Sequence, residues 1–468
     1  MEGTEYKTKE DVLKRAQEAM GLTLGEIDKT GRLKTGKGAV GTVIEESWFG
    51  YSPNSESEPD FPEAGVELKV TPYIKNKGKI RAKERLVCNM IDYMTECNKT
   101  FETSAFWHKC STMLIMSYEY RKGIEKRYYT IDKAILFNFP EEDRMIIKND
   151  WKIIITKIKS GKAHMITEAD TMYLAACTKG ANSKSVREQP FNTIKAKKRA
   201  YSLKSSYMTH ILNAYVFGTQ RDEHIIKDWR ELRDKSFEDY ITEKIKPYIG
   251  CSQDELKKIF HVDSKAKNLN EILFEKMLGI KGKVSKTEEF KSAKIEAKTV
   301  RVQKNGSIRE NMSLPPFKFT EIVNESWEGS RLRRLFETTK YLFVIFIENE
   351  SGDYTFEGAR FWNMPAEDIE ELRIVWERTV EILKQGVKLV RKGSKMYNNL
   401  PKMSENRVAH VRSHGKDAND TEPLPDGRRM TRQSFWLNHT YLESILNTSS
   451  WKEGFDFGLS YDEVADRE

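Results

Sequence analysis

The sequence has little cysteine and no long apolar run. Its 468 residues contain five cysteines, none of them in a C-x-x-C pair: Cys88, Cys97, Cys110, Cys177 and Cys251. An odd number of cysteines without such pairs argues against a disulfide framework or a zinc knuckle, and it fits a reducing cytoplasm. No apolar stretch approaches the roughly 20 residues that cross a bilayer, and the start MEGTEYKTKED lacks the apolar core of a secretory signal. We therefore expect a cytoplasmic protein with no membrane contact.

The sequence also lacks a strong excess of one charge. Its net charge of +8 permits an acidic partner such as nucleic acid, but an ordinary basic protein can carry the same charge. Hydrophobic residues make up 38% of the chain and aromatic residues 11%, which is enough to form buried cores. A chain of 468 residues exceeds what one core usually serves, so we expect two or three domains.

Strand patterns and helix patterns mix without a regular strand–helix–strand rhythm. Residues 66–70 alternate between apolar and polar, which is typical of a strand, and 86–94 and 112–120 are further candidates. Residues 43–49 and 149–158 have helix patterns, each followed by a glycine. The sequence therefore predicts a mixed α/β fold.

Three blocks of the sequence recur in the same order. FNFPEEDRMIIKNDWKIIITKIKSG (137–161) aligns without a gap with WNMPAEDIEELRIVWERTVEILKQG (362–386), at an offset of 363 − 138 = 225. Residues 203–212 recur at an offset of 234, and Glu46 and Glu67-x-Lys69 recur as Glu275 and Glu296-x-Lys298 at an offset of 229. Chance does not give three such blocks in order, so we predict two copies of one domain. We place the first copy at 1–220, a helical linker at 221–245 and the second copy at 246–468.

The residues suited to catalysis lie in the segment PDFPEAGVELK, residues 59–69. On a strand, Glu67 and Lys69 share one face because side chains alternate with a period of two, and Asp60 arrives from the preceding turn. Neighbouring carboxylates repel each other unless a cation lies between them, and Mg²⁺ prefers oxygen ligands. An incidental Glu/Lys pair on an exposed strand is the plain alternative, because E-x-K is very common. Pro-Asp at this spacing favours a nuclease site, in which Lys69 orients or deprotonates water and offsets developing charge.

The PD-x6-E-x-K pattern resembles that of the PD-(D/E)xK nucleases, and the flanking sequence resembles one branch of them, the MutH-like GATC endonucleases. The matching runs cover the first copy in order: RAQEAMGLTLGEI (15–27), KGAVGTVIEESWFG (37–50), AGVELKVTP (64–72), WHKCSTMLI (107–115), EEDRMIIKNDW (141–151), TKGANSK (178–184) and YSLKSSYMTHIL (201–212). The doubled architecture is similar to that of the staphylococcal Sau-type GATC restriction enzymes, whereas the mismatch-repair nickase has one copy. The resemblance implies two tandem PD-(D/E)xK (restriction-endonuclease-like) domains.

The resemblance also implies roles for single residues. Asp60 and Glu67 match the metal-binding acids, Lys69 matches the active-site lysine, and Lys109 matches a second lysine close to the phosphate. A solvated surface charge is the alternative for each lysine taken alone, and a basic strand start is the alternative for His108-Lys109. Cys177 stands where single-copy members tend to have an arginine, which leaves the reader of the guanine open. The expected DNA contacts in the first copy are His108, Lys179, Lys184 and Lys204.

A further acid on the helix before the motif completes the site in the family. Glu45 and Glu46 compete for this role, because the helix is one residue longer here than the family pattern. Counting to Asp60 favours Glu46, and so does the repeat partner of Glu46, which is Glu275. We therefore predict Glu46 as the catalytic acid.

The second copy departs from the motif in two places. Asp60 maps to Glu289, and Lys109 maps to Thr338, so we expect a degenerate and catalytically impaired copy whose retained acids leave weak metal binding open. Arg412 lies in its basic segment and is a candidate for a bidentate contact to guanine. His410 and His414 have the spacing of a helical zinc site, but the residues around them favour a loop over a zinc-binding helix.

These observations predict a bacterial type II restriction endonuclease that uses Mg²⁺ to cut both strands of double-stranded DNA at GATC. The second copy is expected to bind a further GATC site as an allosteric effector, and the protein is expected to be a monomer that dimerises on DNA. A cognate methyltransferase is expected to act on the same site. The alternatives are a MutH-like nicking enzyme of mismatch repair and a non-catalytic DNA-binding regulator. Methylation sensitivity and the cut position stay open.

Overall fold

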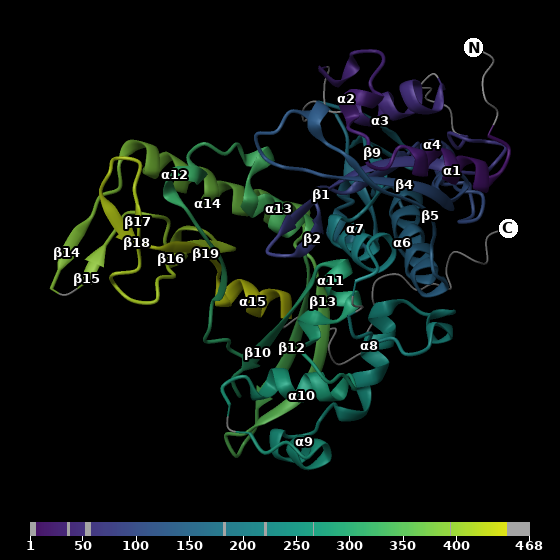
Figure 1. Cartoon of the computed structure of the whole chain (residues 1–468). Helices are drawn as coiled ribbons and strands as arrows, with labels where there is room; N and C mark the ends of the chain where they lie inside the picture. Colours follow the sequence, from purple (N-terminus) through teal and green to yellow (C-terminus); the bar gives the residue numbers. More distant parts are fainter. Residues whose placement is uncertain are drawn as a thin grey trace. The chain divides into compact units, whose positions relative to one another are not determined.

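The computed structural model describes residues 6–34, 38–51, 58–180, 184–219, 222–264, 266–393 and 395–446. Helices and strands mix along this part of the chain, which confirms the mixed α/β prediction (Figure 1). The chain divides into two compact units, the first made of 1–245, 274–297 and 338–342, and the second of 246–273, 298–337 and 343–468. The chain therefore passes from one unit to the other five times. No helix within the described ranges has both the length and the apolar character needed to cross a membrane.

The main sheet of the first unit has the order β2 (Lys79–Ala82), β1 (Glu67–Asn76), β4 (Thr112–Glu119) and β5 (Ile131–Asn138). β1 and β4 are parallel, with Glu67 opposite Met113 and Lys69 opposite Ile115. β4 is buried along nearly its whole length, and the centre of its run TMLIMSYE is four successive apolar residues, 113–116. One buried cluster joins apolar residues of this sheet to three helices: α1 (Lys9–Glu18), α2 (Leu24–Ile27) and α3 (Ala39–Val43).

A smaller antiparallel sheet has the order β3 (Leu86–Met90), β9 (Arg199–Leu203) and β6 (Leu174–Thr178). Between β6 and β9 in sequence, the chain forms a hairpin of β7 (Val186–Gln189) and β8 (Asn192–Lys197). The long helix α6 (Glu141–Lys159) anchors this sheet. Its buried Asp150 carboxylate accepts hydrogen bonds of 2.6 to 2.8 Å from three successive backbone amides, those of Met172, Tyr173 and Leu174. The start of β6 is therefore held against α6.

Part of the second half of the sequence belongs to the first unit. The helix α11 (Glu288–Ala293) packs against α7 (Ser205–Ile211). His210 Nδ1 lies 2.6 Å from the Glu288 carboxylate, and Ser206 Oγ donates a 2.6 Å hydrogen bond to the carbonyl of Ser292. Further helices in the two halves include α4 (Tyr93–Glu96), α5 (Ala105–Cys110), α8 (Phe237–Ile245), α9 (Gln253–Phe260), α10 (Leu269–Met277) and α12 (Phe319–Ile322).

The second half of the chain repeats the series of elements in the first half. The series α5–β4–β5–α6 recurs as α13 (Arg331–Thr338), β12 (Lys340–Glu348), β13 (Tyr354–Trp362) and α14 (Ala366–Gln385). The series β6–β7–β8–β9–α7 recurs as β16 (Ala409–Ser413), β17 (Thr421–Pro423), β18 (Arg429–Thr431), β19 (Gln433–Leu437) and α15 (His439–Leu446). The sheet orders β10-β12-β13 and β11-β19-β16, with β10 (Ile295–Val302) and β11 (Met312–Phe317), correspond to β1-β4-β5 and β3-β9-β6.

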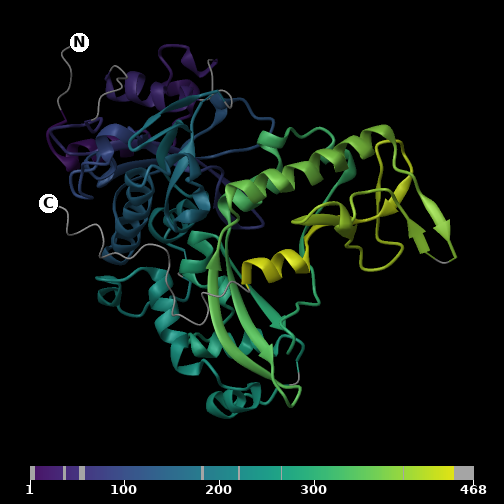
Figure 2. The same ribbon diagram turned by 180° about the vertical axis from the view of Figure 1, so that it is seen from behind.

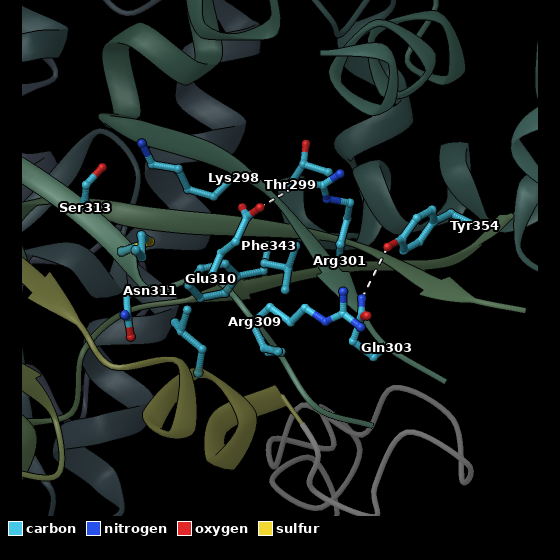
Figure 3. Close-up of a pocket in the computed structure, with 14 residues that line it drawn as sticks. Lys298, Thr299, Arg301, Gln303, Arg309, Glu310, Asn311, Ser313, Phe343 and Tyr354 are labelled. Carbon is cyan, nitrogen blue, oxygen red and sulfur yellow. Dashed lines mark hydrogen bonds and ion pairs between the residues drawn. The ribbon is translucent and has the colours of Figure 1, made fainter. Parts of the chain in front are cut away.

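Two differences separate the halves. The hairpin of β14 (Val390–Lys392) and β15 (Lys395–Tyr397) is inserted between α14 and β16, where the offset of the repeat rises by 234 − 225 = 9 residues. In place of β2, the second half has an isolated bridge between Val302 and Ile308, and a pocket of about 330 Å³ lies beside it. Arg301 in this pocket pairs with Glu310 at 2.8 Å, and Figure 3 shows the Lys298 side chain extending away from this pair.

Candidate active site

The turn before β1 brings Asp60 close to Glu67. Phe61 and Val66 exchange backbone hydrogen bonds of 2.9 and 3.2 Å, and this closes a loop in which Gly65 has a φ of 62°. Glycine suits this left-handed conformation because it has no Cβ. The Phe61 ring is buried against three other aromatic rings, which fixes the base of the loop: Tyr6, Phe49 and Tyr51.

Glu67 lies at the centre of the predicted site. Its Oε1 atom is 2.7 Å from Lys69 Nζ, and its Oε2 atom accepts a 3.2 Å hydrogen bond from the backbone amide of Asp60 and lies 3.5 Å from Lys109 Nζ. The Asp60 carboxylate accepts a 2.9 Å hydrogen bond from the backbone amide of Leu68. The Glu67 side chain is only 3% exposed, and those of Lys69 and Lys109 are each 13% exposed. The structure thus brings together four residues that the sequence singled out.

Burial and charge oppose each other in this cluster. Burial raises the pKa of Glu67 to about 7, an effect that Lys69 reduces and Asp60 increases. Burial by itself lowers the pKa of Lys69, but Cys110 and Glu67 outweigh this effect, so the Lys69 pKa lies above the ordinary lysine value. Glu67 and Lys69 therefore stabilise each other's charged forms, whereas burial and Asp60 oppose the charge on Glu67.

The structure places Glu45 and Glu46 in different surroundings. Glu46 pairs with Arg32, whose Nε atom lies 3.0 Å from its carboxylate. Burial raises the pKa of Glu45, and the charges that act on it next are those of Asp60, Lys69 and Lys109, which are members of the cluster. The charges of the cluster therefore act on Glu45, and this favours Glu45 over the predicted Glu46.

The helix that carries both acids is not a regular α-helix. Residues Ile44–Phe49 form a π-helix, which Gly50 ends in a left-handed conformation. A π-helix takes more residues per turn than an α-helix, so it accommodates an extra residue, and such insertions are frequent at functional sites. Counting positions back from Asp60 along an α-helix therefore does not distinguish Glu45 from Glu46.

The oxygen ligands of the cluster fit a hard divalent cation. Within the described part of the chain, no group of three or more His, Cys, Asp and Glu side chains is arranged to hold a metal ion. Mg²⁺ does not need such a group, because it usually keeps several waters and takes one or two protein carboxylates. Asp60 and Glu67 supply two carboxylates, and a cation between them would relieve the repulsion by which Asp60 adds to the effect of burial on the Glu67 pKa.

Three of the expected DNA contacts have side chains at the surface. His108, in the last turn of α5, is about half exposed, and its Nε2 atom lies 2.8 Å from the Glu58 carboxylate. Lys184 is exposed and Lys179 is half-buried. The expected TKGANSK turn falls partly on 181–183, which lie outside the described residues. Cys177, which stands where single-copy members tend to have an arginine, is buried on β6.

Lys204 does not fit its expected role as a phosphate contact. It immediately precedes α7 and is only 5% exposed, and its Nζ atom donates hydrogen bonds to the backbone carbonyls of Thr171 and Ala293. Burial lowers its pKa to about 7. A lysine in this position joins segments of the first unit, and the sequence around it gives no sign that the side chain is buried.

Arg412 and the two histidines near it lie on or next to β16. The Arg412 guanidinium is exposed and lies 5.5 Å from the centre of the Trp436 ring, so it remains accessible to a ligand. His410 is buried, and its Nδ1 atom lies 2.7 Å from Asn438 Oδ1. His414 Nδ1 lies 3.1 Å from Ser434 Oγ. Each histidine therefore has its own polar partner.

The counterparts of the catalytic acids in the second half have other partners. The buried Glu289 carboxylate, which corresponds to Asp60, accepts hydrogen bonds of 3.0 Å from the backbone amides of Ile225 and Ile226. Glu275, which corresponds to Glu46, accepts one of 3.2 Å from the amide of Val284. Both acids hold backbone in place, so neither carboxylate is free of protein donors.

Known proteins resemble this chain over both halves. The model of the MutH family, described as the DNA mismatch repair enzyme MutH, matches residues 49–150 and 278–374. The type II restriction enzyme Sau3AI of Staphylococcus aureus is 40% identical over 480 residues, which cover 94% of this chain and 98% of that enzyme. The mismatch repair protein MutH of Shewanella woodyi is 35% identical, and that of Escherichia coli 30% identical, each over 188 residues that cover 39% of this chain and 80% of the relative. Identity at this level along nearly the full length of a restriction enzyme shows that the chain belongs to the MutH family and is a type II restriction enzyme, a site-specific deoxyribonuclease.

Proposed function

We propose that this enzyme hydrolyses both strands of double-stranded DNA at GATC sites and requires Mg²⁺. The observation that carries the proposal is the buried Glu67, with Lys69, Lys109 and the Asp60 backbone amide around its carboxylate. The 40% identity to a type II restriction enzyme places this cluster in a cleaving enzyme. The choice of GATC rests on the resemblance to the MutH-like GATC endonucleases.

Each residue of the cluster has a distinct proposed role. Asp60 and Glu67 hold the cation, which when bound polarises the scissile phosphate and lowers the pKa of a bound water. Glu45 completes the acidic side of the site and replaces Glu46 in our assignment. Lys69, whose Nζ atom lies 2.7 Å from Glu67, offsets the charge that develops in the transition state and orients or helps to deprotonate the attacking water. Lys109 adds a second positive charge beside Glu67.

The second copy is proposed to be a degenerate PD-(D/E)xK domain that binds DNA without cutting it. Two observations support this: the repeated order of elements, and the use of Glu275 and Glu289 as acceptors for backbone amides. We keep 1–220 as the catalytic copy, 221–245 as a helical linker and 246–468 as the effector copy that binds a second GATC site. Arg412 is its candidate base contact, and His108, Lys179 and Lys184 are those of the catalytic copy.

The proposed assembly follows from having one active site in each chain. One site cuts one strand, so cleavage of both strands needs two chains on the DNA or two successive nicks. We propose a monomer that dimerises on DNA, in a bacterial cytoplasm where a methyltransferase protects the host sites. Neither the second chain nor the methyltransferase changes the proposed roles of the residues in the cluster.

The test is digestion of unmethylated plasmids with one or several GATC sites, at equal enzyme per site, with Mg²⁺. The proposal expects linear products with ends at GATC and faster cleavage of the plasmid with several sites. Lys69→Ala should bind and not cut, whereas Lys75→Ala, a change to an exposed lysine on the same strand, should cut normally. Equal rates on both plasmids would remove the effector role. Persistent nicks would favour the nickase, and binding without cutting would favour the regulator.

A further inference from the structure

The hairpin of β14 and β15 is an exposed, positively charged ribbon that the second copy has and the first copy lacks. It pairs Val390 with Tyr397 and Arg391 with Met396, and Gly393 in its turn has a φ of 59°, as short hairpin turns require. Both views show it projecting from the end of the second unit, near β17 and β18 (Figures 1 and 2). Arg428, in the turn before β18, donates a 2.7 Å hydrogen bond from its Nη2 atom to the carbonyl of Val387, three residues before β14.

The composition of the ribbon is unlike that of the rest of the chain. Residues 388–397, KLVRKGSKMY, contain four basic residues and no acidic residue, although the whole chain has 79 basic and 71 acidic residues. Lys388, Arg391 and Lys392 are exposed. A stretch of one charge sign on a surface attracts a partner of the opposite sign.

The ribbon also exposes apolar side chains next to its charges. Val390 is 50% exposed, Met396 56% and Tyr397 51%, and Lys392 Nζ lies 5.8 Å from the centre of the Tyr397 ring. Exposed apolar side chains among basic ones suit a partner whose surface presents both phosphates and base edges, as DNA does. The major groove of B-DNA admits a two-stranded ribbon, and it offers thymine methyl groups for apolar contact.

We propose that the β14–β15 ribbon enters a groove of double-stranded DNA and anchors the second copy to it. Arg391 and Lys392 contact phosphates, and Met396 and Tyr397 lie against base edges or sugars. This inference rests on the proposed function, in which the second copy binds DNA. It adds the element that makes the contact and explains why a nine-residue insertion occurs only in that copy (234 − 225 = 9).

The test measures the salt dependence of DNA binding by the full chain. A labelled GATC duplex is titrated with Lys69→Ala protein and with the same protein carrying Arg391→Ala and Lys392→Ala, at several salt concentrations. Each lost phosphate contact reduces the slope of log Kd against log salt by about 0.9, so the double change should reduce it by about 1.8. Lys258→Ala with Lys267→Ala, which removes two exposed lysines from the same unit, is the matched control and should leave the slope unchanged. Tyr397→Ala should weaken binding at every salt concentration without changing the slope.

An unchanged slope in the ribbon variant, with the fold intact by circular dichroism, would overturn the proposal. So would an equal loss in the control pair, because the effect would then reflect net charge alone. The cleavage rates of the two plasmids distinguish a failure of the ribbon proposal from a failure of the proposed effector role. If wild-type enzyme cuts one-site and several-site plasmids equally while the ribbon variant still loses slope, the effector role fails and the ribbon remains a DNA contact.

Discussion

Replacing Glu67 with glutamine is expected to abolish cleavage and, at pH 8, to stabilise the metal-free protein. The ordinary pKa of 4.5 is raised to about 7 for Glu67 in the folded protein, mainly by burial. Between these values the folded state binds more protons than the unfolded state, so the stability that this group contributes is full below pH 4.5 and is lost as the pH rises through 7. A shift from 4.5 to about 7 corresponds to about 3 kcal/mol of unfolding free energy. Glutamine stays neutral and avoids this loss.

Urea unfolding in EDTA at pH 5 and pH 8 measures the effect. The unfolding free energy of Glu67→Gln minus that of wild type should rise between these pH values by about 2 to 3 kcal/mol. Other carboxyl groups whose pKa is raised by burial, such as those of Asp143 and Asp150, titrate in both proteins, so their contributions cancel in the difference between the two unfolding free energies. Glu63→Gln, an exposed change in the same turn, is the control and should show no such rise. A difference between Glu67→Gln and wild type that is the same at both pH values would refute the argument from burial.

Four further substitutions test single residues of the site and of the fold. Glu45→Gln should slow cleavage by about 10²–10³-fold. Glu46→Gln, which breaks the pair with Arg32, should keep the cleavage rate within about threefold of wild type. A larger loss of cleavage in Glu46→Gln than in Glu45→Gln would restore Glu46, the acid chosen by counting residues. Lys109→Ala should reduce single-turnover cleavage by about 10²-fold with little change in duplex affinity, and an equal fall in affinity would make it a binding residue instead. Glu288→Ala should lower the unfolding free energy by about 3–5 kcal/mol, because it leaves the buried His210 without its partner, and thermal unfolding that matches wild type would contradict this.

The core of the site could be predicted from the sequence because it depends on local geometry. Side-chain alternation on β1 puts Glu67 and Lys69 on one face, and the spacing of Asp60 fits a single tight turn. Lys109 required more, because it comes from α5 and reaches Glu67 only through the tertiary fold. The resemblance supplied that contact, since no periodicity in the sequence could.

Other features could not be read from the sequence, for different physical reasons. The π-helix that carries both Glu45 and Glu46 has no local pattern that distinguishes it from an α-helix with one more residue. Lys204 has the composition of a surface residue, and only the carbonyls of Thr171 and Ala293, distant in sequence, explain its burial. The repeat revealed the order of elements in both halves, but not that 274–297 and 338–342 pack with the first unit.

This interleaving has a consequence for how the enzyme is made. The first unit, which contains the proposed cleavage cluster, is not complete until residue 342 has been synthesised, because 274–297 and 338–342 are part of it. Domains generally fold as units while the chain grows from its N-terminus. A ribosome that stops after the first copy releases a chain that lacks the partner of His210 and one of the two carbonyls that hold Lys204. We therefore expect a chain that ends after the first copy to be an unfinished fold and not an active deoxyribonuclease.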